Sequence, residues 1–172
     1  RYPYTCANIN SISLTNPINP GTDKHTVTYE AGADNTGFFI EKYAPKIAYK
    51  TPLLGLTELN YNLDYIEIRL ADTYLMEAEA LIHSGSNAAR AQALLDAVRS
   101  RVGLPSVPAT LENIYTERRL ELATEGHRFF DLVRWGKASA NIPGFVAGKN
   151  ELLPIPIGDL NGTKLKQNPG YN

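Results

Sequence analysis

The chain has 172 residues, of which 43% are hydrophobic and 20% charged, and its net charge is −1. This length and composition predict one soluble globular domain with a sizeable core. The near-neutral charge gives no reason to expect nucleic-acid binding, which usually needs a basic excess. The single cysteine, Cys6, excludes an internal disulfide and a cysteine-rich zinc site.

Residues 1–60 are predicted to be an irregular segment that contains a short β-hairpin. The prolines and the glycine of 16–24 prevent regular structure there. β-Branched and aromatic residues follow in 25–30 and 37–44, separated by the turn-forming sequence AGADNT. We therefore expect these two stretches to pair as the strands of the hairpin.

Residues 61–172 are predicted to form a helical region, whose first two helices span 70–84 and 87–102. Apolar residues recur three and four positions apart in both. Two starts remain open for the first helix, a capping box at Asp64 or a start near Leu70. Gly85 ends this helix, and Ser86 or Asn87 caps the next one. The pair covers 34 residues, 69–102, which is the period of a tetratricopeptide unit.

Two further helices are predicted at 111–125 and 127–136, with Gly126 between them. In the C-terminal tail, two prolines spaced by one residue impose an extended path that does not fit inside a sheet. The predicted fold is therefore mainly α, in one domain. It comprises a tetratricopeptide-like helix pair, further helices, a short N-terminal β-hairpin and an extended proline-containing tail.

Charged side chains gather in the stretch 117–136, which also holds the only tryptophan. The residues are Glu117, Arg118, Glu121, Glu125, Arg128, Asp131, Arg134 and Trp135. On a continuous helix, the charges from Glu125 to Arg134 alternate in sign every three residues, which favours ion pairs. The acids of 117, 121 and 125 repeat every four residues, so they need cations from elsewhere. We interpret the stretch as a structural lock of paired charges, in which Arg128 pairs with Glu125, Asp131 or a carbonyl of the tail.

Other interpretations of this stretch are weaker. A glycosidase needs two carboxylates at a cleft, one with a raised pKa, whereas the arginines here lower carboxyl pKa values. His127 and Asp131 could share a metal ion, but two ligands do not make a site. The sequence has no phosphate-binding glycine loop and no nucleophile elbow. We therefore predict no enzyme activity, no catalytic residue, no metal site and no cofactor. None of the ten tyrosines is selected as a ligand platform.

Three stretches together resemble the C-terminal part of SusD/RagB-type proteins. They are RLADTYLMEAEAL (69–81), ERRLELATEGHRFFDLVRWG (117–136) and LLPIP followed by LKQNPGY (152–171). TGFFIEKY (36–43) resembles the short aromatic strand that precedes them in the family. The order and spacing of these stretches make the resemblance specific, and it covers roughly residues 36–172.

The resemblance implies a mainly helical, tetratricopeptide-like fold and a nutrient-binding role without catalysis. Family members are outer-membrane lipoproteins at the cell surface of Bacteroidetes-type bacteria. They capture oligosaccharides for a TonB-dependent transporter of the SusC type.

Such proteins are usually about three times longer. We therefore expect this chain to be the C-terminal part of a longer protein. The lipid-bearing cysteine, most ligand-binding residues and an N-terminal part that packs against this one would lie upstream. The alternative is a helical-repeat scaffold for protein interactions without sugar binding.

Overall fold

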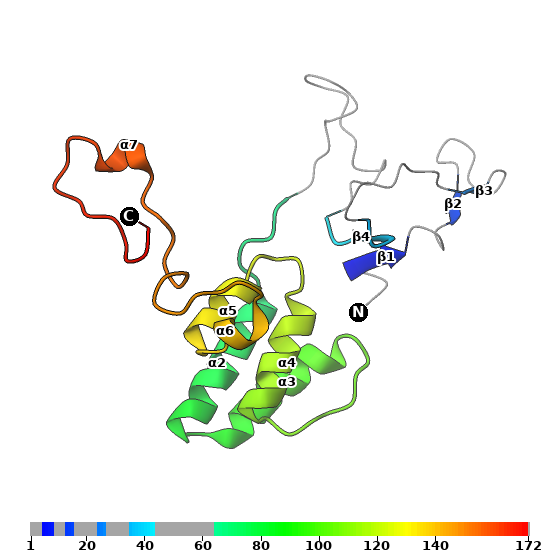
Figure 1. Ribbon diagram of the computed structural model, residues 1–172. Coiled ribbons are helices and arrows are strands. Elements are labelled where there is room, and N and C mark those ends of the chain that lie inside the picture. The colour runs from blue at the N-terminus through cyan, green and yellow to red at the C-terminus, as the bar shows by residue number, and fades with distance from the viewer. Residues whose placement is uncertain (1–4, 9–12, 16–23, 27–34, 44–63, 172) are drawn as a thin grey trace. The chain divides into compact units, whose positions relative to one another are not determined.

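The computed structural model describes residues 5–8, 13–15, 24–26, 35–43 and 64–171. Contacts divide the chain into two compact units, residues 1–125 and 126–172. Where the structure describes it, the first unit contains short strands and three long helices, and the second contains short helices and the C-terminal tail (Figure 1). The mainly helical fold is thereby confirmed. The predicted single domain with a change of character near residue 60 stays a prediction.

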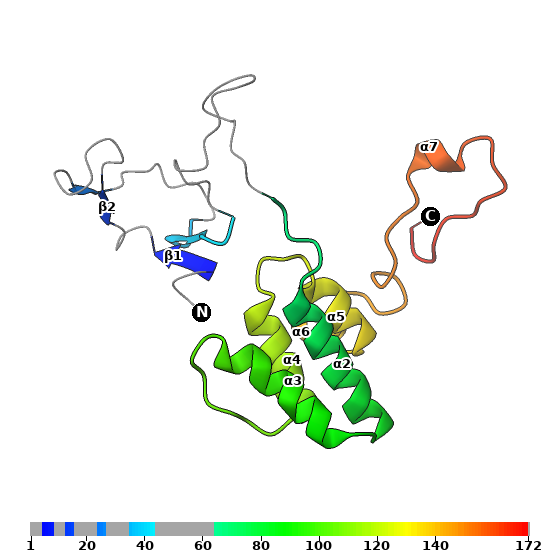
Figure 2. The same cartoon turned by 180° about the vertical axis from the view of Figure 1, so that it is seen from behind.

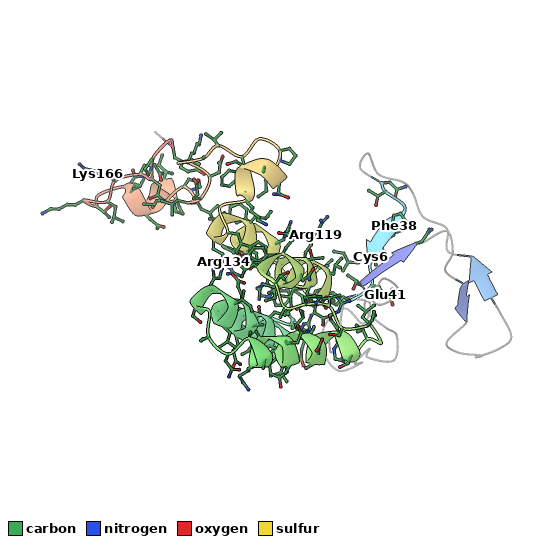
Figure 3. The ribbon with its side chains drawn as sticks, turned by 90° about the horizontal axis from the view of Figure 1, so that it is seen from below. Cys6, Phe38, Glu41, Arg119, Arg134 and Lys166 are labelled. Atoms are coloured by element: carbon green, nitrogen blue, oxygen red, sulfur yellow. The ribbon has the colours of Figure 1, made fainter. Side chains whose placement is uncertain are left out.

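Within the described residues, short strands pair two by two. β1 (Cys6–Asn8) is antiparallel to β4 (Phe38–Ile40), and β2 (Ser13–Thr15) is antiparallel to β3 (Lys24–Thr26). Figure 3 labels Cys6 and Phe38 on the first pair and Glu41 just beyond it.

An N-terminal hairpin is present as β2 and β3, but the predicted pairing of 25–30 with 37–44 is wrong. Each of these stretches pairs with a strand earlier in the chain, and residues 27–30 and 44 lie outside the described residues. The prediction rested on the turn-forming sequence AGADNT, which favours pairing of the stretches on either side of it, whereas side-chain packing decides which strands pair.

The long helices among the described residues of the first unit are α2 (Leu70–Ser84), α3 (Ala88–Ser100) and α4 (Leu111–Glu121). α2 packs against both α3 and α4 (Figures 1 and 2). Their facing sides form one apolar core. It consists of Leu75 and Ala78 of α2, Ala91, Leu94, Leu95 and Val98 of α3, and Ile114 of α4.

The helix pair α2–α3 follows the predicted boundaries closely. α2 begins at Leu70, the second of the two open starts, and it ends at Gly85, whose φ of 66° is left-handed. Glycine adopts this conformation without the steric cost that a Cβ atom adds. Asn87 caps α3 by accepting a hydrogen bond of 3.1 Å from the N–H of Arg90. The two helices are therefore separated by only three residues.

The predicted helix 111–125 ends four residues early, at Glu121. Continuing it to residue 125 would use the carbonyl of Glu121 in a helical hydrogen bond, and continuing it to residue 127 would also use that of Ala123. Lys42 Nζ instead donates to both carbonyls, at 3.1 and 3.0 Å, and Arg69 Nη2 donates to that of Glu121 at 2.8 Å. Thr124 then turns the chain with a φ of 73°. Contacts from distant residues thus end α4 before Gly126.

The second unit contains α5 (Arg128–Arg134), α6 (Ala138–Asn141) and α7 (Ile157–Leu160). Residues 153–156 of its tail, which include both prolines, form no helix, strand or turn before α7 begins, and side chains satisfy their backbone. Ile155 stands between two prolines, which have no N–H to donate. Gln167 accepts from the Ile155 N–H and donates to its carbonyl, both at 2.8 Å. Asn168 and Tyr171 donate to the carbonyls of Leu153 and Leu152, at 2.7 and 3.0 Å.

Candidate functional site

α4 and the turn after it carry four charged side chains that are almost fully buried. Glu117, Arg118, Glu121 and Glu125 are between 1% and 4% exposed. Glu117 and Glu121 are four residues apart and share one face of the helix. Charges taken out of water need partners to remain ionised, so the fold depends on what faces them.

Two ion pairs tie α4 to its neighbouring helices. Arg118 Nη1 lies 2.7 Å from Asp72 Oδ1 of α2, and both side chains are buried. Arg99 of α3 places Nη1 2.6 Å from Glu117 Oε2. Its Nε also donates to the carbonyl of Pro105 at 2.8 Å. α2 and α3 are therefore each joined to α4 by an ion pair, in addition to the core that the three helices share.

A larger group, the α4 charge cluster, surrounds the C-terminal end of α4 and consists of Lys42, Arg69, Arg101, Glu121 and Glu125. Arg69 donates two hydrogen bonds to Glu125, from Nε to Oε2 at 2.7 Å and from Nη2 to Oε1 at 2.9 Å. Its Nη1 lies 2.7 Å from Glu121 Oε1, which Arg101 also contacts. Lys42 Nζ lies 2.5 Å from Glu125 Oε1. Cations at this end also face the negative pole of the helix dipole.

The α4 charge cluster keeps Arg69 and Glu125 ionised. Burial alone would raise the pKa of Glu125, but hydrogen bonds from Arg69 and Lys42 hold that pKa below its usual value. Burial likewise disfavours the Arg69 guanidinium, yet its hydrogen bonds to Glu125 and Glu121 raise the pKa of Arg69. A carboxylate held in this state is a poor proton donor. The chemistry of the cluster therefore suits cross-linking of chain segments better than acid catalysis.

The remaining lock residues lie in the second unit. Asp131 is 4% exposed and accepts hydrogen bonds from Arg134 Nη2 and Nε, at 2.9 and 3.1 Å. The Arg134 guanidinium also lies 4.9 Å from the ring centroid of Trp135. Glu125 stands in the turn before α5, so the predicted ladder does not follow one continuous helix. The early end of α4 is the reason, and the pairing of Arg128 stays a prediction.

The four cations and the one acid that complete these pairs were not predicted from the sequence. They are Lys42, Arg69, Asp72, Arg99 and Arg101. The sequence indicated the cations only indirectly, because acids repeated every four residues need cations from other parts of the chain. Lys42 lies in TGFFIEKY, whereas Arg69 and Asp72 lie in RLADTYLMEAEAL. The charge pairs therefore connect stretches that had been recognised separately.

Among the described residues, no three His, Cys, Asp or Glu side chains are grouped so that they could hold a metal ion. None of the described helices combines the length and apolar character needed to cross a bilayer.

Comparison with known proteins gives consistent matches. The model of the SusD family matches residues 7–151. SusD-like protein P2 from Formosa agariphila is 30% identical over 142 residues, which are 69% of this chain and 28% of that protein.

Two solved structures resemble the chain over most of its length. A laminarin-binding SusD-like protein is 58% identical, with a TM-score of 0.77 over 84% of this chain and 31% of that one. Surface glycan-binding protein A from Bacteroides thetaiotaomicron, in complex with laminarihexaose, is 34% identical, with a TM-score of 0.72 over 83% and 33%. The chain thus spans about a third or less of the length of these proteins.

Proposed function

The chain belongs to the SusD family, and from this premise we propose that it is part of a surface protein that captures a glucan for uptake. The observation that carries the proposal is the 58% identity to a laminarin-binding SusD-like protein over 84% of this chain. The structure that contains laminarihexaose, at 34% identity, supports the same ligand class. The proposed ligand is therefore a laminarin-type glucan.

The proposed setting is the outer membrane of a Bacteroidetes-type bacterium, where a lipid anchor holds the protein at the cell surface. The protein passes its ligand to a TonB-dependent transporter of the SusC type. It acts by binding alone, without catalysis and without a cofactor. The paired state of the buried acids supports this part of the proposal, since Glu125 is kept as a carboxylate.

The charged stretch is proposed to act as a structural lock. Its members are Glu117, Arg118, Glu121, Glu125, Arg128, Asp131, Arg134 and Trp135. Support comes from ion pairs that reach α2, α3 and the segment after β4. In this role the lock fixes the framework on which a ligand-binding surface is built, and it does not itself contact the ligand.

The test is a set of titrations followed by calorimetry. The full-length protein encoded by the gene is titrated with laminarihexaose, cellohexaose and maltohexaose. We expect laminarihexaose to bind at least about ten-fold more tightly than the other two, a difference of about 1.4 kcal/mol. Chromatography after long incubation should recover the hexaose uncut. A preference for maltohexaose, or the appearance of shorter sugars, would contradict the proposal.

A further inference from the structure

One aromatic ring of the first unit is both exposed and held in a defined orientation. Tyr65 is 68% exposed. Its ring stacks on that of Tyr43, with centroids 5.5 Å apart and planes inclined by 19°. This is the geometry of a parallel stack, which restricts rotation of the exposed ring. Because Tyr43 covers one face of the Tyr65 ring, solvent reaches the opposite face.

The ring beneath Tyr65 is itself fixed. Tyr43 is half-buried, and its hydroxyl lies 3.5 Å from the carbonyl of Ile66. Burial, together with the nearby Glu125 carboxylate, raises the pKa of Tyr43, so its phenol remains neutral. The stack therefore has a rigid and uncharged base.

The α4 charge cluster holds both chain segments that carry the two rings. Lys42 directly precedes Tyr43, and Arg69 follows Tyr65 by four residues. Both cations bind the same carboxylate, that of Glu125. Two segments more than twenty residues apart are thus fixed at one point, and the aromatic stack lies next to that point.

The surroundings of Tyr65 suit a sugar. Asp64 and Glu67 flank it in sequence and are exposed. A pyranose ring offers an apolar C–H face to a flat aromatic ring and hydroxyl groups at its rim, which carboxylates and a phenol can bind. An aromatic surface with a few polar groups is also the common composition of small-molecule sites.

We propose that Tyr65 is a carbohydrate subsite whose outer face stacks on a glucose unit of the bound glucan, with Tyr43 as a positioning residue beneath it. This inference rests on the proposed function and adds a contact within this chain to it. A single subsite supplies part of the affinity, so it agrees with the expectation that most ligand contacts come from elsewhere in the protein.

A second exposed aromatic side chain provides a matched control. Phe130 is 66% exposed, close to the value for Tyr65. It packs edge-on against Phe129, at 5.5 Å and 87°, and it carries no hydroxyl group. It also belongs to the other unit. Removal of the Phe130 ring should therefore leave glycan affinity unchanged.

The experiment measures the affinity of the gene-encoded protein for laminarihexaose, cellohexaose and maltohexaose in four variants. Tyr65→Ala and Tyr65→Leu should each weaken binding about ten-fold, because both lack the flat ring. Leu retains an apolar contact with Tyr43, so a loss in this variant reports the ring itself and not the fold. Tyr65→Trp should stay within about two-fold of the wild type, as should Phe130→Ala. Thermal melting checks that each variant is folded.

The outcomes separate this inference from the proposed function. Binding of laminarihexaose that does not depend on Tyr65 overturns the subsite alone. Binding of another glycan that does depend on Tyr65 supports the subsite and overturns laminarin as the ligand. A folded protein that binds none of the three sugars overturns both.

Discussion

The two units of the chain are held by different kinds of contact. In residues 1–125, buried ion pairs join positions far apart in sequence, such as Lys42 with Glu125, 83 positions apart, and Asp72 with Arg118, 46 apart. In residues 126–172, side chains bind backbone groups nearby, as Gln167 binds Ile155 at a separation of 12. Long-range pairs fix helices against one another, whereas short-range bonds shape only the loop that contains them.

The first unit also buries more of its apolar side chains than the tail of the second unit does. The first unit has a core from three helices, with Leu75, Leu95 and Ile114 fully buried. In the tail of the second unit, Leu153 and Ile157 are 68% and 79% exposed. We therefore expect the first unit to determine the free energy of unfolding, and the second to show local order that can be lost separately.

The largest effect is expected from breaking the buried pair between α2 and α4. Arg118→Ala leaves the Asp72 carboxylate buried without its cation and should lower the free energy of unfolding by about 3–5 kcal/mol. Urea unfolding followed by circular dichroism measures the change. The exposed pair Arg90–Glu77 is the control, and Arg90→Ala should not shift the midpoint detectably. Equal midpoints for the two variants would show that burial of the α4 charges contributes nothing.

An intermediate effect with a distinct pH dependence is expected at Glu125. Because the pKa of Glu125 is lowered in the folded state, its carboxylate stabilises the fold above the unfolded pKa, about 4.3, and this contribution is lost as pH falls through the lower folded pKa. Glu125→Gln should cost about 1–3 kcal/mol at pH 7, and the difference from the wild type should shrink toward pH 3.

Unfolding curves recorded between pH 7 and pH 3 test this expectation. The exposed Glu67 provides the control, and Glu67→Gln should follow the wild-type curve. A constant difference between Glu125→Gln and the wild type at every pH would rule out a role for the charge of Glu125.

The smallest effect is expected in the second unit. Gln167→Ala removes both hydrogen bonds to Ile155, a local loss of about 1 kcal/mol. Hydrogen exchange of the Ile155 amide should become faster, while amides in α2–α4 should keep their protection. Faster exchange throughout α2–α4 would contradict the contrast between the two units.

Local patterns predicted the helices well but could not predict where distant residues would interrupt them. The Gly85 stop and the Asn87 cap are local signals, and both are present. The end of α4 depends on Lys42, which lies 79 residues before Glu121, so no window of sequence around Gly126 contains the cause. The prediction of strand pairing was wrong for the same reason, since β4 pairs with β1, which is distant in sequence.

The acids of the candidate site on α4 and the turn after it were predicted from the sequence, but their partners were not. The excess of acids on one face of α4 indicated that cations were needed, but the sequence does not say which of 17 lysines and arginines supply them. Tyr65 could not be selected from ten tyrosines, because exposure and stacking on Tyr43 arise only once 43 and 65 are brought together.

We infer that the α4 charge cluster stabilises the first unit by cross-linking segments that are distant in sequence. A double-mutant cycle between Arg69 and Glu125 tests it most directly, using the free energies of unfolding of the wild type, Arg69→Ala, Glu125→Ala and the double variant. The two hydrogen bonds between these side chains predict a coupling energy of about 1–3 kcal/mol at pH 7. Effects that add to within about 0.3 kcal/mol would contradict the claim, because the two charges would then stabilise the fold independently.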